Sequence, residues 1–523
     1  MRWPVFRGSA DPVRHAATWA ASALIVVWSA VLLTRTNAQG AHTRLLDTVG
    51  LIAAWRYGWS LLHFLRAAVF LHLVFPQVAA RARQTKQATK ISHIYAVVAS
   101  FNIPEAQFRA VYRSLAANCL ALGVPATLVA AVTSDRDCAI LAQLIAELGE
   151  TENIEIIAQF QRGDGKRSAL AMALRCIAQK LPPANALTVF LDGDIVLEPD
   201  ALRKSVPFFQ ADPALGAITS NNDAVLNTDG LTRHWYGLRH AQRHVLMASM
   251  ALSGRLLVLT GRFSMYRTAD SIDPAFIAAV EDDHIDHWLY GRIPLLSGDD
   301  KSIWFHLLKR QRKMLYIPDV KAVGFEGLPQ GDSFVVGTSR LMFRWFGNML
   351  RANEKAIRLG PQTCGGFLWW ALVDQRLSMW TAMVGPITAI LFSIVVSPLF
   401  LLYYLAWVAV TRTVVSALEG LLWGRFDPTW PFLMAYTQIW GSFLKIYLQF
   451  RLNRQSWTRQ GIRQGATISV ENLAGAALHA LAVDGGDHLA IAGQQRLGRA
   501  HLGAERQLAL GQAVRAVLRV FGA

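Results

Sequence analysis

An α/β domain with a mostly parallel sheet, flanked by transmembrane α-helices, is the fold that this sequence predicts. The chain has 523 residues, of which 53% are hydrophobic, and its mean hydropathy of +0.27 is high for a purely soluble protein. The apolar residues concentrate before residue 76 and between residues 366 and 450. Between these regions, short β-rich runs alternate with longer helical patterns, which indicates βαβ units and a parallel sheet.

Residues 1–79 are expected to form an N-terminal membrane region with two apolar segments. The first, Ala16–Thr34, contains no charge and follows three arginines, which predicts a spanning helix with a cytoplasmic N-terminus. A signal peptide is the alternative for this segment. The second, Thr48–Phe75, contains Arg56 and Arg66, which are costly inside a membrane and therefore predict a protein interior or a wet path. An amphipathic interfacial helix is the alternative for the second segment.

Residues 80–360 are expected to form a cytoplasmic domain, because their composition is that of a soluble protein. Strands are predicted at His93–Ala99, Ala126–Val132, Ile154–Ala158, Leu187–Asp192 and Leu215–Ser220, with helices at Pro104–Leu122, Asp137–Leu148 and Ser168–Gln179. Ligands of such sheets bind at the carboxyl ends of the strands. The sequence contains neither a Gly-x-Gly-x-x-Gly nor a Walker motif, which disfavours a dinucleotide-binding fold and a P-loop ATPase.

Residues 361–465 are expected to form a C-terminal membrane region with interfacial helices. Met379–Val396, Leu399–Val415 and Trp430–Tyr447 are its candidate spans. Three spans after a cytoplasmic domain would place the basic segment Arg451–Arg463 outside the cell, against the positive-inside rule. A re-entrant or interfacial segment is one way to resolve this parity. The tail, residues 466–523, is rich in Ala, Gly and Leu and is expected to be poorly ordered and not catalytic.

Charge and cysteine content narrow the class of protein further. A protein with a formal charge of +16 could bind nucleic acid, anionic lipid or an acidic substrate. The sequence resembles no nucleic-acid-binding module, so nucleic acid is not an expected partner, and a membrane surface and an acidic product remain. The cysteines (Cys119, Cys138, Cys176 and Cys364) are scattered, which disfavours a disulfide framework or a zinc site.

A pair of alternate carboxylates follows a predicted strand that is almost wholly apolar. Asp192-Gly193-Asp194 comes directly after Leu187–Leu191. Carboxylates placed in this way suit a Mg²⁺ or Mn²⁺ ion that also takes the diphosphate of a nucleotide sugar. Aspartates that merely form a turn are the alternative, but the buried strand before them favours the metal.

Two further polar motifs open predicted helices. Gly163–Ser168 contains Lys166, which could reach a phosphate, although a helix start with solvated cations is nearly as good an interpretation. Gly298-Asp299-Asp300-Lys301 follows an apolar run, and a carboxylate there could be a general base for a hydroxyl group. Helix capping is the alternative for these aspartates. A second acidic cluster, Glu281–His284, is expected on a helix. It is a weaker candidate for a catalytic site than Gly298-Asp299-Asp300-Lys301.

Arg344-Trp345 lies shortly before the C-terminal membrane region. The aromatic ring could stack on a sugar and the arginine could pair with an anion. An interfacial anchor of tryptophan and arginine is the alternative interpretation.

The ordered motifs together resemble those of the processive, membrane-embedded family 2 glycosyltransferases, which include cellulose and hyaluronan synthases. These motifs are Gly165-Lys166-Arg167, Asp192-Gly193-Asp194, Thr260-Gly261-Arg262, Gly298-Asp299-Asp300-Lys301 and Arg344-Trp345. Within that group the chain is most similar to the bacterial alginate (mannuronan) polymerases. The strings that carry this likeness, from about residue 50 to residue 460, are Trp55-Arg56-Tyr57, Ala241-Gln242-Arg243-His244, Tyr316-Ile317-Pro318-Asp319, Arg344-Trp345-Phe346-Gly347-Asn348, Asp374-Gln375-Arg376-Leu377-Ser378-Met379-Trp380-Thr381 and Arg454-Gln455-Ser456-Trp457-Thr458-Arg459-Gln460. One departure is Leu341, where the wider family usually has glutamine.

The resemblance implies a GT-A-like, nucleotide-sugar-binding domain and a role for each matched residue. Asp192 and Lys166 would bind the donor, and Asp194 would bind the divalent cation. Asp300 would be the catalytic base on the acceptor 4-hydroxyl, with Asp299 and Lys301 holding its loop. The remaining implied residues are Arg344 and Trp345 at the donor and acceptor sites, and Arg56, Arg66, Arg239 and Arg243, with Trp345, along the acceptor and translocation path.

The implied reaction is inverting transfer from GDP-mannuronate to a growing β-1,4-linked polyuronate chain, with export across the bacterial inner membrane. A co-polymerase subunit that binds cyclic di-GMP is the implied partner. A synthase that uses a UDP-sugar, and a non-catalytic membrane scaffold or channel, are the alternatives. The presence of both Asp194 and Asp300 disfavours the scaffold.

Overall fold

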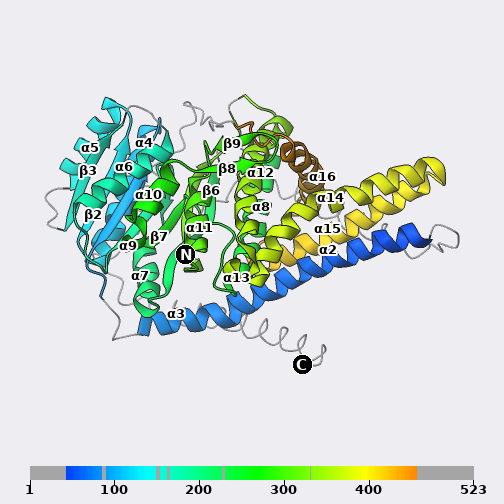
Figure 1. Cartoon of the computed structure of the whole chain (residues 1–523), viewed down its shortest axis with the longest axis horizontal. Helices are drawn as coiled ribbons and strands as arrows, with labels where there is room; N and C mark the ends of the chain where they lie inside the picture. Colours follow the sequence, from blue (N-terminus) through cyan, green and yellow to red (C-terminus); the bar gives the residue numbers. More distant parts are fainter. Residues whose placement is uncertain are drawn as a thin grey trace, which may run out of the picture.

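A mixed eight-stranded sheet and a projecting bundle of long helices organise the computed structural model (Figure 1). The structure describes residues 43–84, 90–148, 153–161, 165–226, 230–329 and 331–455. The predicted first span, Ala16–Thr34, and the tail of residues 466–523 lie outside these residues. The predicted class, an α/β domain with a mostly parallel sheet beside apolar helices, is confirmed.

The sheet has the strand order β3-β2-β1-β4-β7-β6-β10-β5. The strands are β1 (Ile94–Ala99), β2 (Ala126–Val132), β3 (Ile154–Phe160), β4 (Leu187–Asp192), β5 (Ile195–Leu197), β6 (Leu215–Leu226), β7 (Phe263–Arg267) and β10 (Lys313–Glu326). The first four strands in this order run parallel, and β6 pairs in parallel with β10. The strands β7 and β5 are antiparallel to their neighbours. β6 extends beyond the predicted Ser220 because its polar end, Asn221–Asp223, also pairs with β10.

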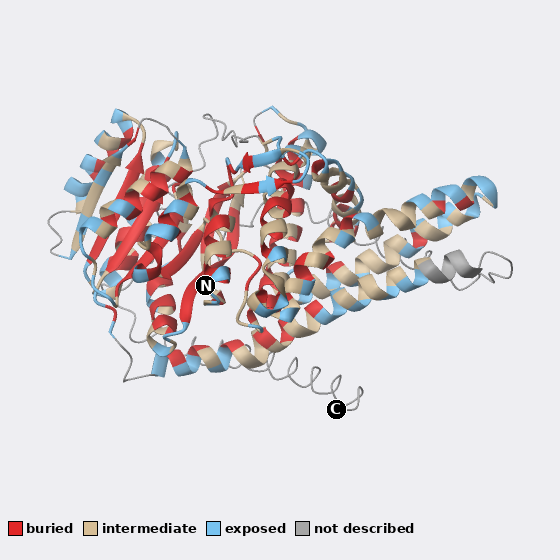
Figure 2. Ribbon diagram, in the orientation of Figure 1, coloured by how far each residue is buried: buried red, intermediate tan, exposed pale blue. Residues whose placement is uncertain are grey.

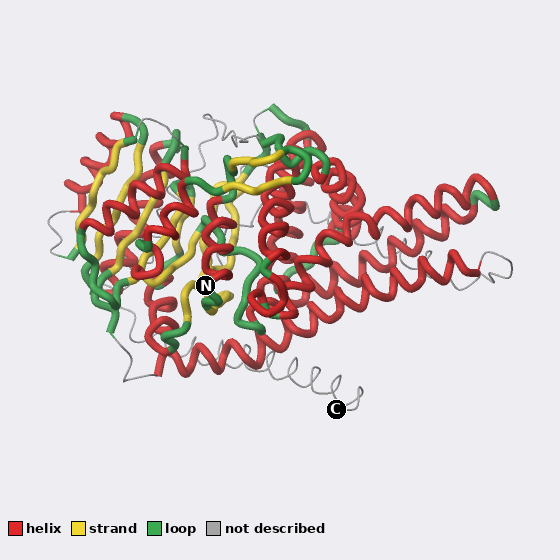
Figure 3. Tube along the Cα trace, viewed as in Figure 1, coloured by secondary structure: helices red, strands yellow, loops and turns green. Residues whose placement is uncertain are grey.

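Helices cover both faces of the sheet (Figure 3). On one face α6 (Lys166–Gln179) packs against β1 and β2 and contacts α10 (Pro274–Glu281), which in turn contacts α11 (Asp299–Lys309). The helices α4 (Glu105–Leu122), α5 (Asp135–Leu148) and α7 (Ala201–Ala211) form a second contiguous group. The strand β2 is buried along its whole length, as expected for a central parallel strand covered on both faces.

Three helices in the described part of the chain are long and apolar enough to cross a membrane. One is α2 (Thr43–Val69), which continues through a π-helical turn, η2 (Phe70–Val74), into α3 (Phe75–Gln84). The others are α14 (Gly366–Val395) and α15 (Leu399–Trp423). In the projecting part, α14 and α15 carry many exposed apolar side chains (Figure 2). These helices identify the chain as a membrane protein.

The helix α16 (Trp430–Gln449), which the sequence suggested as a third C-terminal span, is not among these three. Gln438 and Lys445 interrupt its apolar sequence. It packs against α12 (Phe334–Arg358), α14, α15 and α8 (Leu231–Ala251), while Phe432 and Phe443 stay exposed. Of the three predicted C-terminal spans, α14 and α15 are long and apolar enough to cross a membrane, and α16 is left as the candidate for the interfacial segment.

The arginines of the second apolar segment have protein partners. A guanidinium nitrogen of Arg56 lies 2.6 Å from a carboxylate oxygen of Asp374 on α14. Arg66 lies over the ring of Phe367, 3.7 Å from its centroid, and donates to the carbonyl of Ser249 and the hydroxyl of Ser253 on and after α8. These contacts offset the cost of placing two cations in an apolar helix.

We predict that the pair of Arg56 and Asp374 holds α2 against α14. The side chain of Asp374 is 5% exposed, so Arg56→Gln leaves a buried carboxylate without its cation. We expect this to lower the free energy of unfolding by about 3 kcal/mol. Asp374→Asn should also destabilise the protein, and the double variant should lose less than the sum of the two single losses. Thermal unfolding of all four proteins in detergent measures the coupling; strictly additive losses would contradict it.

Candidate active site

The carboxyl end of β4 places the first pair of carboxylates. Asp192 is the last residue of the strand, and the amide of Gly193 donates to the carbonyl of Ala99 at 3.1 Å. A Cβ atom at residue 193 would lie 2.7 Å from the hydroxyl oxygen of Ser100. Only glycine therefore fits between Asp192 and Asp194 at this edge of the sheet.

Lys166, at the start of α6, joins two of the predicted motifs. Its ammonium nitrogen lies 2.7 Å from Asp192 Oδ1 and 2.9 Å from Asp299 Oδ2. Burial alone would lower the pKa of Lys166, but the two carboxylates outweigh burial and raise it. Lys166 is therefore a permanent cation between the strand that carries Asp192 and the helix that carries Asp299.

Asp194 lies beside these groups in a buried environment. Burial, followed by the negative charge of Asp192, raises its pKa to about 6, and the positive charge of Arg262 opposes this shift. Arg262 forms an ion pair with Glu326 and donates to the carbonyl of Asp223 at 3.2 Å. The sequence singled out Arg262 only as part of a motif, because its position beside Asp194 depends on the pairing of β6 with β7 and β10.

The adjacent carboxylates of Asp299 and Asp300 have different environments. Burial alone would raise the pKa of Asp299, but the Lys166 ammonium outweighs burial and holds it below its ordinary value. Burial, followed by the charge of Asp299, raises the pKa of Asp300 to about 6. Two neighbouring carboxylates whose pKa values are pushed apart in this way are typical of an acid–base site.

Lys301 points away from Asp300. Its ammonium nitrogen donates to the carbonyl of Leu257 at 2.7 Å and lies over the ring of Trp304. Burial lowers the pKa of Lys301 to about 8, and the charge of Asp300 opposes the shift. Lys301 therefore anchors the start of α11 to the segment before β7.

A cavity brings the motifs together. Its lining is formed by Lys166, Leu170, Phe190, Leu191, Asp192, Thr260, Gly261, Tyr266, Asp299, Asp300 and Ile303. Four of the predicted site residues, from three motifs, thus face one space.

Arg344 and Trp345 approach this space from α12. Burial lowers the pKa of Arg344, and the charges of Tyr236, Asp192 and Asp300 oppose the shift. Trp345 stacks on Trp235 of α8, with ring centroids 5.8 Å apart. The guanidinium of Arg239 lies over both rings, 4.7 Å from the centroid of Trp345 and 5.3 Å from that of Trp235.

Arg239 and Arg243 lie one turn apart on α8, and burial lowers the pKa of each to about 10. Lys445 of α16, which the sequence analysis missed, joins this group. Its ammonium lies over the ring of Phe346, and burial, followed by the charges of Arg239 and Arg56, lowers its pKa to about 8. A single lysine within an apolar helix was the signal in the sequence. Among the residues that the structure describes, neither Arg239 nor Lys445 is paired with a carboxylate.

Two predicted groups lie elsewhere. Arg66 binds Ser249, ten residues or about 15 Å along α8 from Arg239. The acidic cluster at residues 281–284 is not helical as expected: α10 ends at Glu281, and His284 begins the short strand β8 (His284–His287). Glu281 pairs with Arg175, and Asp283 pairs with Lys355 of α12.

Comparison with known proteins agrees with this geometry. Residues 92–348 match the family described as Glycosyltransferase like family 2. The chain is 36% identical over 446 residues to the protein named Glycosyltransferase alg8 of Pseudomonas syringae pv. tomato (strain ATCC BAA-871 / DC3000), covering 85% of this chain and 90% of that protein. It is 39% identical over 414 residues to Glycosyltransferase alg8 of Azotobacter vinelandii, covering 79% and 83%.

Among solved structures, the chain is similar to the mannosyltransferase PcManGT from Pyrobaculum calidifontis in complex with GDP-Man and Mn²⁺, with 16% identity, a TM-score of 0.49 and coverage of 77% of this chain and 99% of that one. It is also similar to GalNAc-T7 with UDP, GalNAc and Mn²⁺, with 11% identity, a TM-score of 0.30 and coverage of 48% and 46%.

The sheet, the carboxylates at its edge and the apolar helices define a membrane-associated family 2 glycosyltransferase. The relatives narrow this class, because they extend over most of the chain, including the helices outside the catalytic domain. The chain belongs to the Alg8 glycosyltransferases, the alginate polymerases.

Proposed function

We propose that the enzyme transfers mannuronate from GDP-mannuronate to the 4-hydroxyl of a growing β-1,4-linked polymannuronate chain and takes part in its export. The observation that carries the proposal is that the two adjacent carboxylates have different environments. Lys166 forms an ion pair with Asp299, whereas the pKa of Asp300 is raised. Asp300 can therefore take a proton near neutral pH.

In the proposed reaction, the acceptor hydroxyl oxygen attacks the anomeric carbon of the donor while Asp300 takes the hydroxyl proton. The bond between that carbon and the diphosphate breaks, and GDP leaves with the electron pair. Lys166 and Asp192 position the donor nucleotide and its diphosphate. Arg344, whose charge interacts with those of Asp192 and Asp300, would stabilise negative charge between donor and acceptor.

Asp194 and Asp192 fit a divalent cation. Both are hard oxygen ligands, and a bound cation would offset the burial and the charge of Asp192 that together raise the pKa of Asp194. Such a pair suits Mg²⁺ or Mn²⁺, which proteins commonly hold with one or two carboxylates and the phosphates of a substrate. When bound, such an ion would neutralise charge on the departing diphosphate.

The group of Arg239, Arg243 and Lys445 favours an acidic acceptor over a neutral one. Arg239 lies over Trp235 and Trp345, and withdrawing three cations from water is costly unless an anion accompanies them. The carboxylates of a polyuronate would supply that anion, and the tryptophans would stack on sugar rings. Location in the inner membrane with a cytoplasmic catalytic domain, and control by a cyclic di-GMP-binding co-polymerase, stay predictions.

Donor competition on purified membranes tests the proposed sugar. Labelled GDP-mannuronate should give an acidic polymer, and an excess of UDP-glucose or UDP-N-acetylglucosamine should not reduce the incorporation. If label enters polymer only from a UDP-sugar, the uronate assignment fails and a synthase of the cellulose or hyaluronan type replaces it.

We predict that Asp194→Ala and Asp300→Asn each abolish polymer formation while the protein still inserts in membranes. Loss of a positioned base alone typically reduces a rate by ~10²–10⁴-fold. Asp286→Asn, at an exposed aspartate of β8, is the matched control and should keep normal activity. Near-normal incorporation from either site variant would refute its assigned role.

The raised pKa of Asp300 predicts a pH dependence of kcat. The base must be ionised to accept a proton, and burial and Asp299 raise its pKa to about 6, so activity should be full above pH 7 and fall as the pH drops through 6. Well below that point, the fall should approach tenfold per pH unit. Saturating Mn²⁺ and donor separate this effect from titration of Asp194. A kcat that stays constant down to pH 5 would exclude Asp300 as the base.

We predict that Lys445→Gln shortens the polymer or lowers its yield roughly tenfold, the loss expected for one charged contact, without changing the KM for the donor. Size-exclusion chromatography of the labelled product measures its length. Lys309→Gln, at an exposed lysine of α11, is the control. An increase in donor KM with unchanged polymer length would place Lys445 at the donor site instead.

A further inference from the structure

The segment directly after α16 lies on the loop that leads into the catalytic carboxylates. The side-chain amide of Gln455 donates to the carbonyl of Pro294 at 2.7 Å, and its oxygen accepts from the amide of Leu296 at 3.0 Å. The hydroxyl of Tyr290 donates to the carbonyl of Phe450 at the start of the same segment. The side-chain amide of Gln455 therefore both donates to and accepts from the loop backbone, as the peptide groups of a neighbouring β-strand do.

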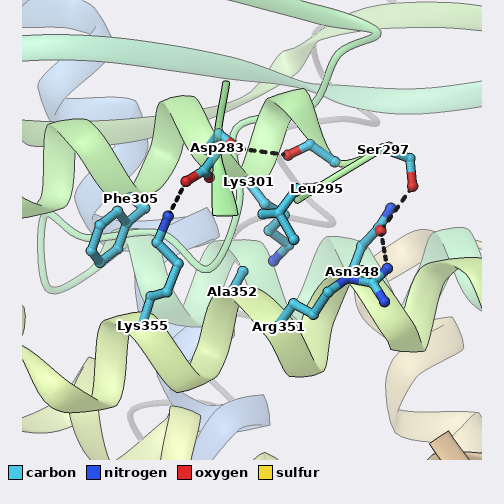
Figure 4. A pocket seen from close by; sticks show the side chains of 11 residues that line it. Asp283, Leu295, Ser297, Lys301, Phe305, Asn348, Arg351, Ala352 and Lys355 are labelled. Carbon is cyan, nitrogen blue, oxygen red and sulfur yellow. Dashed lines mark hydrogen bonds and ion pairs between the residues drawn. The ribbon is translucent and has the colours of Figure 1, made fainter. Parts of the chain in front are cut away.

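A second chain of contacts links this segment to the loop. Arg351 of α12 is 3% exposed; it donates to the carbonyl of Leu452 at 3.0 Å and to the side-chain oxygen of Asn348 at 2.7 Å. The same oxygen of Asn348 accepts from the hydroxyl of Ser297 at 3.0 Å. Figure 4 shows Ser297 and Arg351 converging on Asn348 from opposite sides.

The opposite side of the loop is held by the residue next to Lys166. The guanidinium of Arg167 donates to the carbonyl of Ser297 at 3.2 Å and to the hydroxyl of Ser302 at 3.0 Å. Gly298 follows with φ of +87°, and a Cβ atom there would lie 3.2 Å from Asn348. Because Asp300 is two residues further on, a shift of Leu296 or Ser297 would move the proposed base.

We propose that the segment after α16 positions the catalytic loop through the side chain of Gln455, its positioning residue, and through the carbonyls of Phe450 and Leu452. Gln455 acts through the backbone of residues 294–296, to which both ends of its side-chain amide are bonded. The proposal rests on the proposed role of Asp300, and it couples the end of α16, which carries Lys445, to the base. A displacement of about 1 Å at a reacting group can cost about 10²-fold in rate, so two hydrogen bonds suffice to matter.

The test compares three full-length variants reconstituted in lipid nanodiscs. Gln455→Ala removes both hydrogen bonds and should lower kcat at least about tenfold, while the KM for GDP-mannuronate stays within about twofold. Gln455→Glu keeps the acceptor for Leu296 but loses the donor to Pro294, so its kcat should be intermediate. Asn453→Ala, at an exposed residue of the same segment, should behave as the wild type.

Hydrogen exchange gives a readout that does not depend on activity. Peptides covering residues 290–298 should exchange faster in Gln455→Ala than in Asn453→Ala, because the amide of Leu296 loses its acceptor. Unchanged exchange, or a raised KM with unchanged kcat, would overturn the proposal. Asp300→Asn, assayed in parallel, separates the two hypotheses: if it is active, the proposed base is wrong, whereas an inactive Asp300→Asn beside a fully active Gln455→Ala refutes the positioning role alone.

Discussion

The ion pairs of Lys166 are the interaction on which the rest of the site depends. They join Asp192, at the end of a strand, to Asp299, at the start of a helix that arrives much later in the chain. Without the ammonium, two carboxylates would face each other in a partly buried space, and each would be driven towards protonation. With it, Asp299 is neutralised and Asp300 is left as the carboxylate of raised pKa. Three short motifs thereby form one electrostatic unit.

The parallel half of the sheet could be predicted because each of its strands is a compact apolar run, and β2 and β4 begin and end at the predicted residues. The strands β5, β7 and β10 were not predicted. β5 has only three residues, and β10 mixes buried and exposed positions along a strand that bends at a register shift. The helix α16 differs from the neighbouring candidate spans because Gln438 and Lys445 interrupt its apolar sequence.

The carboxylates of the site could be predicted because acidic residues at the end of a buried strand, or after a glycine at a helix start, have few structural reasons to be there. The roles of Arg262 and Gln455 could not be found in this way. Each matters through a partner far away in the sequence: Glu326 for Arg262, and the backbone of Pro294 and Leu296 for Gln455. Such pairings are set by tertiary structure and leave no local pattern.

The helix that runs from α2 through η2 into α3 also constrains how the family can vary. One end is fixed to α14 by the pair of Arg56 and Asp374, and the other is fixed to the catalytic domain by the stacked rings of Phe75 and Phe208. One residue added between these points would rotate the domain about the helix axis by about 100° relative to the membrane bundle. The number of residues between Arg56 and Phe75 is therefore under stronger constraint than their identity, and homologous chains should differ here by substitution, with insertions confined to the loops.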